Sequence, residues 1–294
     1  MPLEQQLTLR TTLPVFCLSF LFNKNNFAKF YLVIALSLTS TTINADCNNG
    51  TIIISGKPEY PPVSWIKGNE LTGLGYQAMK QIIKQLNQKE NLNLKLEITA
   101  PLPWKRAIHM TNLGEIDILV GVRQSTERSK HLTFIPTRLI ESAQNIFSLI
   151  GTDISTNSDL KGKTGGVRAG INFSADFTTF AKRQQLVFEE VQKLEQNIQK
   201  LKLNRLDYFI APLLPTIHHI RKRQIDIDIQ FTTQPLFTSK EKIAISKKSS
   251  CLKYIDQINT QLETLHNNGF IDQQFDELTQ DWNVLEYVKS SNSG

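Results

Sequence analysis

Arg128 is the residue with the clearest chemical potential in this chain, where it ends the run Ser125-Thr126-Glu127-Arg128. A guanidinium group presents a planar fork of N–H donors that can hold a carboxylate through two parallel hydrogen bonds. The alternative is a surface ion pair with Glu127 or Glu141, which would give Arg128 no binding role. We therefore take Arg128 as the main candidate for binding an anionic group.

Three aromatic residues are the next candidates for a binding site. Tyr60 and Trp65 follow a predicted strand at 51–55, and Trp104 stands at the start of a predicted helix. A loop at the carboxyl edge of a sheet can present aromatic faces to a small ligand. Packing of the same rings beneath their loops is an equally good interpretation, and it stays open. Backbone groups from Gly121 to Arg123, just beyond another predicted strand, would complete one wall of such a pocket.

Catalytic and metal-binding patterns are weak by comparison. There is no Cys-x-x-Cys or His-Glu-x-x-His spacing, and the adjacent His218 and His219 would point to different faces of a helix. Glu70, Glu141 and His109 are the acids and bases near the candidate pocket, and each is of a type usually found on a surface. We predict no catalytic residue, no metal site and no cofactor.

The first 45 residues have the composition of an export signal. Apolar runs at 13–22 and 30–38 are separated by Lys24 and Lys29, and a small, polar stretch follows at 39–45. The second run, with its positive flank and this stretch, predicts a signal peptide over 1–45 and a periplasmic protein. Neither run reaches the roughly 18 to 20 apolar residues that span a bilayer, which disfavours a retained anchor.

Cleavage is expected after Ala45, and lipidation is disfavoured because Asp46, rather than a small residue, precedes Cys47. The remaining chain has 30 basic and 26 acidic residues, a mild excess, and no segment that gathers basic and aromatic residues together. These features argue against a nucleic-acid partner.

Beyond the leader, predicted strands and helices alternate. Periodicity predicts strands at 51–55, 92–98 and 116–120 and helices at 73–86 and 103–113. A second series begins after 151, with strands at 164–167, 186–189, 206–211, 225–231 and 242–246 and helices at 172–182, 191–201, 213–221, 250–267 and 271–278. Such alternation predicts parallel sheets with helices on their faces and binding sites at the carboxyl ends of the strands.

We interpret the two series as two α/β lobes. Two extended crossings, at 144–149 and 241–246, would join them and permit hinge closure. Lobe one would then be discontinuous, comprising 46–144 and 247–294, and lobe two would comprise 145–246 with the hinge strands.

The order of several short motifs resembles one family, the family 3 extracellular solute-binding proteins, typified by polar amino-acid receptors of ABC transporters. The motifs are Tyr60-Pro61-Pro62, Leu71-Thr72-Gly73-Leu74-Gly75, Trp104-Lys105-Arg106, Gly114-Glu115-Ile116-Asp117, Ser125-Thr126-Glu127-Arg128, Leu160-Lys161-Gly162-Lys163, Asn204-Arg205-Leu206-Asp207, and Asn268-Gly269-Phe270-Ile271 ahead of Trp282. Each motif is weak alone, but their order and spacing together are specific.

The resemblance implies a two-lobed, type II-like periplasmic binding fold and a monomer that captures a small polar, carboxylate-bearing solute for an ABC permease or a sensor kinase. In members that bind amino acids, the arginine at the place of Arg128 holds the ligand's α-carboxylate. The ligand-binding residues we expect are Tyr60, Trp65, Trp104, Gly121, Arg123, Arg128 and Asn172.

The second lobe departs from the family pattern. Gly170 is followed by Ile171 and Asn172 rather than by Ser or Thr, and Ala211-Pro212 occupy the region where amino-acid receptors place an acid. An ammonium group without a carboxylate partner is costly in a dry cleft. A standard α-amino acid is thus in doubt, and Arg168 and Asn172 favour a ligand rich in acceptors, although Arg168 could equally be solvated.

Two further expectations follow from the resemblance. Some similar proteins are dehydratases acting on prephenate- or arogenate-like acids, so a cyclohexadienyl or arogenate dehydratase is the alternative function. The two cysteines outside the leader, Cys47 and Cys251, suit an oxidising compartment. On the family's topology they would be neighbours and form a disulfide.

Overall fold

The computed structural model describes residues 47–171 and 173–282. The predicted signal peptide and Asn172 lie outside these residues, so both remain predictions. Within the described ranges, no helix combines the length and apolarity needed to cross a membrane.

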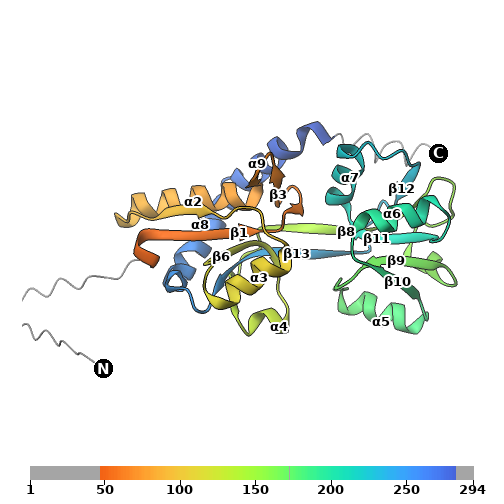
Figure 1. Ribbon diagram of the computed structural model, residues 1–294, viewed down its shortest axis with the longest axis horizontal. Coiled ribbons are helices and arrows are strands. Elements are labelled where there is room, and N and C mark those ends of the chain that lie inside the picture. The colour runs from red at the N-terminus through yellow and green to blue at the C-terminus, as the bar shows by residue number, and fades with distance from the viewer. Residues whose placement is uncertain (1–46, 172, 283–294) are drawn as a thin grey trace, which may run out of the picture. The chain divides into compact units, whose positions relative to one another are not determined.

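The first series of predicted elements forms a parallel part of a large sheet (Figure 1). We call it the first half-sheet, and its strands are β1 (Thr51–Gly56), β5 (Lys95–Ile98) and β6 (Ile118–Arg123). Helix α2 (Leu74–Glu90) connects β1 to β5 after a short hairpin, and α3 (Trp104–Leu113) connects β5 to β6. The strand and helix alternation predicted from periodicity is therefore confirmed here.

The second series forms another parallel part of the same sheet, which we call the second half-sheet. Its strands are β9 (Thr164–Arg168), β10 (Val187–Val191) and β11 (Tyr208–Pro212). Its helices are α5 (Ala175–Arg183), α6 (Leu194–Lys202) and α7 (Leu213–Lys222). A short strand, β12 (Ile229–Phe231), pairs antiparallel with β8.

Two long strands, β8 (Ile140–Leu149) and β13 (Phe237–Ser246), join the half-sheets (Figure 1). They pair with each other, antiparallel, over residues 140–144 and 237–241. The rest of β8 pairs with β11 and β12, and the rest of β13 pairs with β6 and β7 (Leu132–Phe134). The predicted crossings at 144–149 and 241–246 fall on these strands, but the mutual pairing begins about four residues earlier in each.

Several short elements escaped the sequence analysis. Strands β2 (Glu59–Tyr60), β3 (Ser64–Lys67) and β4 (Glu70–Thr72) make a small antiparallel sheet before α2. Helix α4 (Thr126–Ser129) is capped by the Ser125 side chain, and η2 (Asn157–Leu160) by Thr156. The chain continues through η3 (Ser250–Tyr254), α8 (Ile255–Asn267), α9 (Phe270–Thr279) and η4 (Gln280–Trp282). Strands of two to four residues are too short for a periodic signal.

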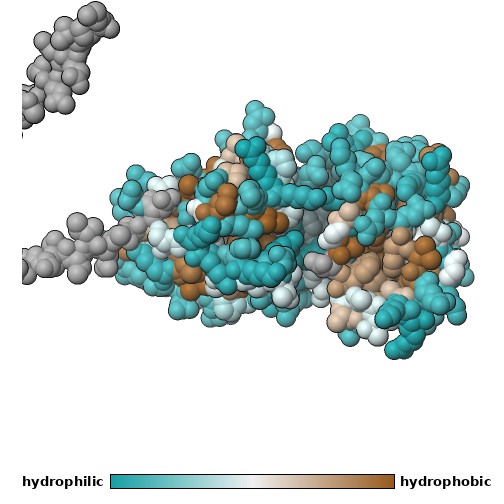
Figure 2. Space-filling model, turned by 60° about the horizontal axis from the view of Figure 1, so that its bottom comes forward, coloured by the Kyte–Doolittle hydropathy of each residue, from teal (hydrophilic) through white to brown (hydrophobic). Residues whose placement is uncertain are grey.

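The buried cores follow the half-sheets. Two clusters gather around the first, one of them uniting α2, α8 and α9 through residues such as Ile82, Leu262 and Ile271. Two others flank the second half-sheet, around Phe147 and Phe209 on one side and Phe177 and Tyr208 on the other. This arrangement supports two lobes, with the terminal helices in the first, although the lobe boundaries remain a prediction. Hydrophilic residues cover much of the face drawn in Figure 2, with apolar patches between them.

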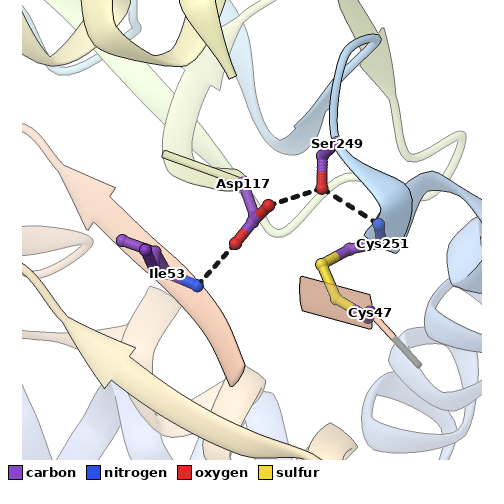
Figure 3. The surroundings of a disulfide bond; sticks show 5 residues. All are labelled: Cys47, Ile53, Asp117, Ser249 and Cys251. Atoms are coloured by element: carbon purple, nitrogen blue, oxygen red, sulfur yellow. Dashed lines mark hydrogen bonds between the residues drawn. A yellow bond between two sulfur atoms is a disulfide. The ribbon is translucent and has the colours of Figure 1, made fainter. Parts of the chain in front are cut away.

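The predicted disulfide between Cys47 and Cys251 is present, with a Cα–Cα distance of 4.6 Å across 204 positions of sequence. Figure 3 shows its surroundings. The Ser249 hydroxyl accepts a hydrogen bond from the Cys251 amide at 3.0 Å and donates one to Asp117 Oδ1 at 2.6 Å, and the Ile53 amide donates to Asp117 Oδ2 at 2.8 Å. The disulfide and this chain of hydrogen bonds tie η1 (Cys47–Gly50), β1 and η3 together.

Candidate binding site

A pocket of about 410 Å³ lies where the carboxyl ends of the parallel strands of both half-sheets meet. Lys57 follows β1, Trp104 follows β5, and Arg123 ends β6. Arg168 ends β9 and Pro212 ends β11, and both line the same pocket. Small-molecule sites in α/β sheets usually lie at such strand ends, and the volume suits a small ligand.

A buried carboxylate organises the first half-sheet's wall of this pocket. Glu241, on β13, has no exposed side-chain surface. Its Oε1 accepts hydrogen bonds from the Tyr60 hydroxyl at 3.0 Å and from Arg123 Nε at 2.9 Å, and its Oε2 accepts one from Lys57 Nζ at 3.0 Å. Tyr60 also contacts Ser142 Oγ on β8 at 2.9 Å. The wall is held rigidly because both carboxylate oxygens are engaged.

Burial and neighbouring charges shift the pKa values of the side chains in this network. Burial lowers the pKa of Lys57 to about 8, against the opposing attraction of Glu241. Burial alone would raise the pKa of Glu241, but the charges of Lys57 and Arg123 outweigh it, so that pKa lies below its usual value. Burial also raises the pKa of Tyr60 to about 12. Glu241 is therefore ionised near neutral pH, and Lys57 is the group closest to titrating.

Gly121 positions this wall without lining it. It is the extra residue of a β-bulge between β6 and β13, because Lys242 pairs with Val122 whereas Ile243 pairs with Val120. Its φ is +67°, and an added Cβ would lie 2.5 Å from Val63 Cγ1. The bulge shifts the register so that Arg123 pairs directly with Glu241. The sequence predicted that the backbone of Gly121 would line the pocket. In the structure, Gly121 instead sets the strand register that places Arg123 beside Glu241.

Arg128 lines the pocket from α4. Its Nη1 donates to the Arg123 carbonyl at 2.8 Å, and its own amide is capped by Ser125 Oγ at 3.3 Å. The alternative ion pairs are not formed, because Glu127 pairs with Lys130 and Glu141 with Arg138. Burial, and then repulsion from Arg123, lower the pKa of Arg128. The guanidinium is thus held in place with donors still available.

The second half-sheet contributes a less constrained wall. Arg168 to Gly170 are exposed, and Ile171 and Ala211 also line the pocket. Gln144, on β8, is fully buried at the pocket, and its Oε1 has no hydrogen-bond partner among the described residues. The Gln144 amide nitrogen donates to Ser142 Oγ at 3.4 Å, so the amide oxygen is the group left to accept from a bound molecule.

The three aromatic residues predicted to bind a ligand do not all line this pocket. Tyr60 and Trp104 line the pocket, with Lys57 Nζ 3.8 Å from the centre of the Tyr60 ring and 5.6 Å from that of Trp104. Trp65 lies outside it, on a separate pocket, where its ring is 6.1 Å from Trp282 and 6.4 Å from His218. The packing interpretation therefore describes Trp65, because Trp65 points from β3 toward α7 and η4.

Another pocket, of about 430 Å³, lies on a different side of Tyr60. Its polar groups contact one another: Arg138 Nε lies 3.4 Å from Glu141 Oε1, and His266 Nε2 contacts the Arg138 carbonyl at 2.8 Å. It therefore offers fewer uncommitted groups than the pocket that Arg128 lines.

The acid–base candidates Glu70, Glu141 and His109 are exposed and lie outside the Arg128 pocket.

Two residues of this site were not predicted from the sequence. Lys57 could have been found, because it directly follows the first strand. Glu241 had no local signal, since only the folded sheet brings it beside Arg123.

Comparison with known proteins gives a consistent result. The chain is 25% identical over 236 residues to the L-cystine-binding protein TcyJ of Escherichia coli K12, covering 77% of this chain and 82% of that protein. An ancestral arginine-binding protein bound to arginine superposes with a TM-score of 0.60 at 23% identity, covering 80% and 98% of the two chains. The probable amino-acid ABC transporter extracellular-binding protein ytmK of Bacillus subtilis gives 0.65 at 20% identity, covering 79% and 97%.

These matches establish the α/β periplasmic binding protein fold, and the matched proteins are binding proteins rather than enzymes, which sets the dehydratase alternative aside. The sequence profile of the bacterial extracellular solute-binding proteins, family 3, matches residues 52–283. The chain therefore belongs to the family 3 bacterial extracellular solute-binding proteins.

Proposed function

We propose that this protein captures a small polar, carboxylate-bearing solute in the Arg128 pocket and delivers it to an ABC-type membrane transporter. The observation that carries the proposal is the wall of Lys57, Arg123 and Arg128 at the carboxyl ends of the first half-sheet. A carboxylate can accept from the Arg128 fork while Arg123 stays fixed on Glu241. The matched relatives named for cystine and arginine binding support this solute class.

The pocket also supports a mechanism of capture by closure. Both half-sheets contribute to its lining, and within the sheet β8 and β13 connect them through the 140–144 and 237–241 pairing. A small rotation about these two strands would bring the second wall onto a solute already held by the first. The transporter would then recognise the closed form. Export through the predicted signal peptide would place the protein where such solutes are met.

A thermal-shift screen of the purified protein tests this function. Amino acids, organic acids and polyamines would be compared, because a ligand bound to the folded state raises the melting temperature by mass action. We expect stabilisation by carboxylate-bearing solutes and none by polyamines. Small-angle scattering at saturating solute should show a smaller radius of gyration. Stabilisation by polyamines alone would contradict the proposal.

A further inference from the structure

The charges lining the Arg128 pocket are unbalanced. Four cationic side chains line it: Lys57, Arg123, Arg128 and Arg168. The carboxylates nearby are Glu59, which is exposed on β2, and Glu241, which lies buried behind the wall. The cations exceed these carboxylates by two.

Neither carboxylate is well placed to receive an ammonium group in a dry cleft, because Glu59 is exposed to solvent that screens its charge, whereas Glu241 is buried and already paired. Glu241 has both oxygens engaged, and its side chain has no exposed surface. On the second half-sheet, Ala211 and Pro212 occupy the strand end where an acid would face the ligand. A bound ammonium group would therefore lose its hydration with little in return, close to the repelling charge of Lys57.

The donors, by contrast, come from both walls. Arg128 uses one Nη1 hydrogen on a carbonyl, and Arg123 uses Nε on Glu241, so each keeps further N–H groups for a bound anion. On the opposite wall, the Arg168 side chain has no hydrogen bond or ion pair with any other described residue. Two separated groups of arginine donors match a molecule with two anionic groups.

We propose that the solute is an organic dianion, with one carboxylate held by Arg128 and Arg123 and a second by Arg168, and that no buried, uncommitted carboxylate is provided for an α-ammonium group. The inference rests on the proposed function and narrows its solute class. The unpaired Gln144 Oε1 remains to accept a hydrogen bond from a neutral donor group of the same molecule.

Calorimetry at fixed ionic strength can separate the effect of a second anionic group from that of an ammonium group. The four probes are 2-oxoglutarate, L-glutamate, L-glutamine and L-arginine. Glutamate and glutamine differ in the second anionic group, whereas 2-oxoglutarate and glutamate differ in the ammonium. We expect 2-oxoglutarate to bind tightest, then glutamate, with glutamine at least about tenfold weaker than glutamate, as expected for one lost charge-assisted pair. Arginine should bind weakest.

Two variants locate the second anionic group. Arg168→Gln should bring the affinities for glutamate and glutamine to within about twofold of each other. Arg205→Gln, an exposed change in the segment between α6 and β11, should leave the preference intact. Tighter binding of glutamine or arginine than of both dicarboxylates, 2-oxoglutarate and glutamate, would overturn the inference and leave the proposed function standing. A preference for glutamate that survives Arg168→Gln would remove the role of Arg168. Binding of none of the four probes would overturn the dianion inference, whereas the thermal-shift screen decides the proposed function.

Discussion

The two walls of the pocket are built differently. On the first, Lys57, Tyr60 and Arg123 are fixed on the buried Glu241, and at the opposite end of β1 a disulfide ties η1 to η3. On the second, Arg168 to Gly170 are exposed, and the described part of that half-sheet contains no disulfide. A charged group held in place before binding loses little entropy when the ligand arrives. The first wall is therefore suited to binding strength, and the second to closure and choice of solute.

Replacing Glu241 should weaken the first wall, and with it the stability of the protein, more than any other single substitution that we propose. Glu241→Gln leaves Lys57 and Arg123 beside a neutral group, and we expect the free energy of unfolding to fall by about 3 kcal/mol, as for other broken buried ion pairs. Urea denaturation measures the change. Glu127→Gln, which removes an exposed pair with Lys130, is the matched control and should leave the free energy of unfolding nearly unchanged. Equal losses in the two variants would refute the preorganised wall.

Removal of the disulfide should weaken the first half-sheet selectively. Changing both Cys47 and Cys251 to Ser should lower the free energy of unfolding by about 2 to 5 kcal/mol. Amide hydrogen exchange should then show lost protection in β1 and α8 before β9 and β11. The reduced wild-type protein is the control for the serine substitutions. Uniform loss of protection across both half-sheets would argue against a local staple.

Arg128→Ala should separate binding from stability. Loss of a charge-assisted contact should weaken binding of the preferred solute by about tenfold to a hundredfold, while the free energy of unfolding changes by less than about 1 kcal/mol. Arg128→Lys should restore little, because an ammonium lacks the fork. Calorimetry and urea denaturation give the two quantities. An affinity within about twofold of wild type would rule out the carboxylate clamp.

The smallest expected effect is a pH dependence that runs in opposite directions for binding and stability. The pKa of Lys57 lies at about 8 in the folded protein, below its ordinary value of 10.5. Above pH 8 the pocket loses a positive charge, so affinity for an anionic solute should fall. Between pH 8 and 10 the unfolded chain binds more protons at this side chain, so Lys57 should make stability rise.

The variant Lys57→Met tests this pH dependence, because the neighbouring groups do not titrate in the same range. Glu241 and Arg123 face Lys57 and keep their charges in this range, and Tyr60 titrates only near pH 12. Lys57→Met should therefore flatten both pH profiles. Unchanged profiles in that variant would assign the dependence to another group.

Much of the fold and part of the site could be predicted from the sequence. Periodicity identified most strands and helices of both half-sheets because each buries a regular apolar stripe, as α2 does through Met79, Ile82 and Leu86. Tyr60 could be chosen because it follows a strand end, and Arg128 because its guanidinium offers a fork of donors at the place of the family's arginine. Trp104, chosen at a helix start, lines the same pocket. Family resemblance added the Cys47–Cys251 pairing, which the sequence separation of 204 positions would otherwise conceal.

The tertiary structure decided which charges face one another. Glu241 lies on a strand whose local pattern is unremarkable, and the bulge at Gly121 brings it into register with Arg123. Trp65 could not be separated from Tyr60 by sequence, because both follow β1, yet one side chain packs toward Trp282 and the other lines the pocket. Residue type and local periodicity determine what a side chain can do and which element carries it. Register and long-range packing determine its partners, because these depend on contacts between segments far apart in the chain.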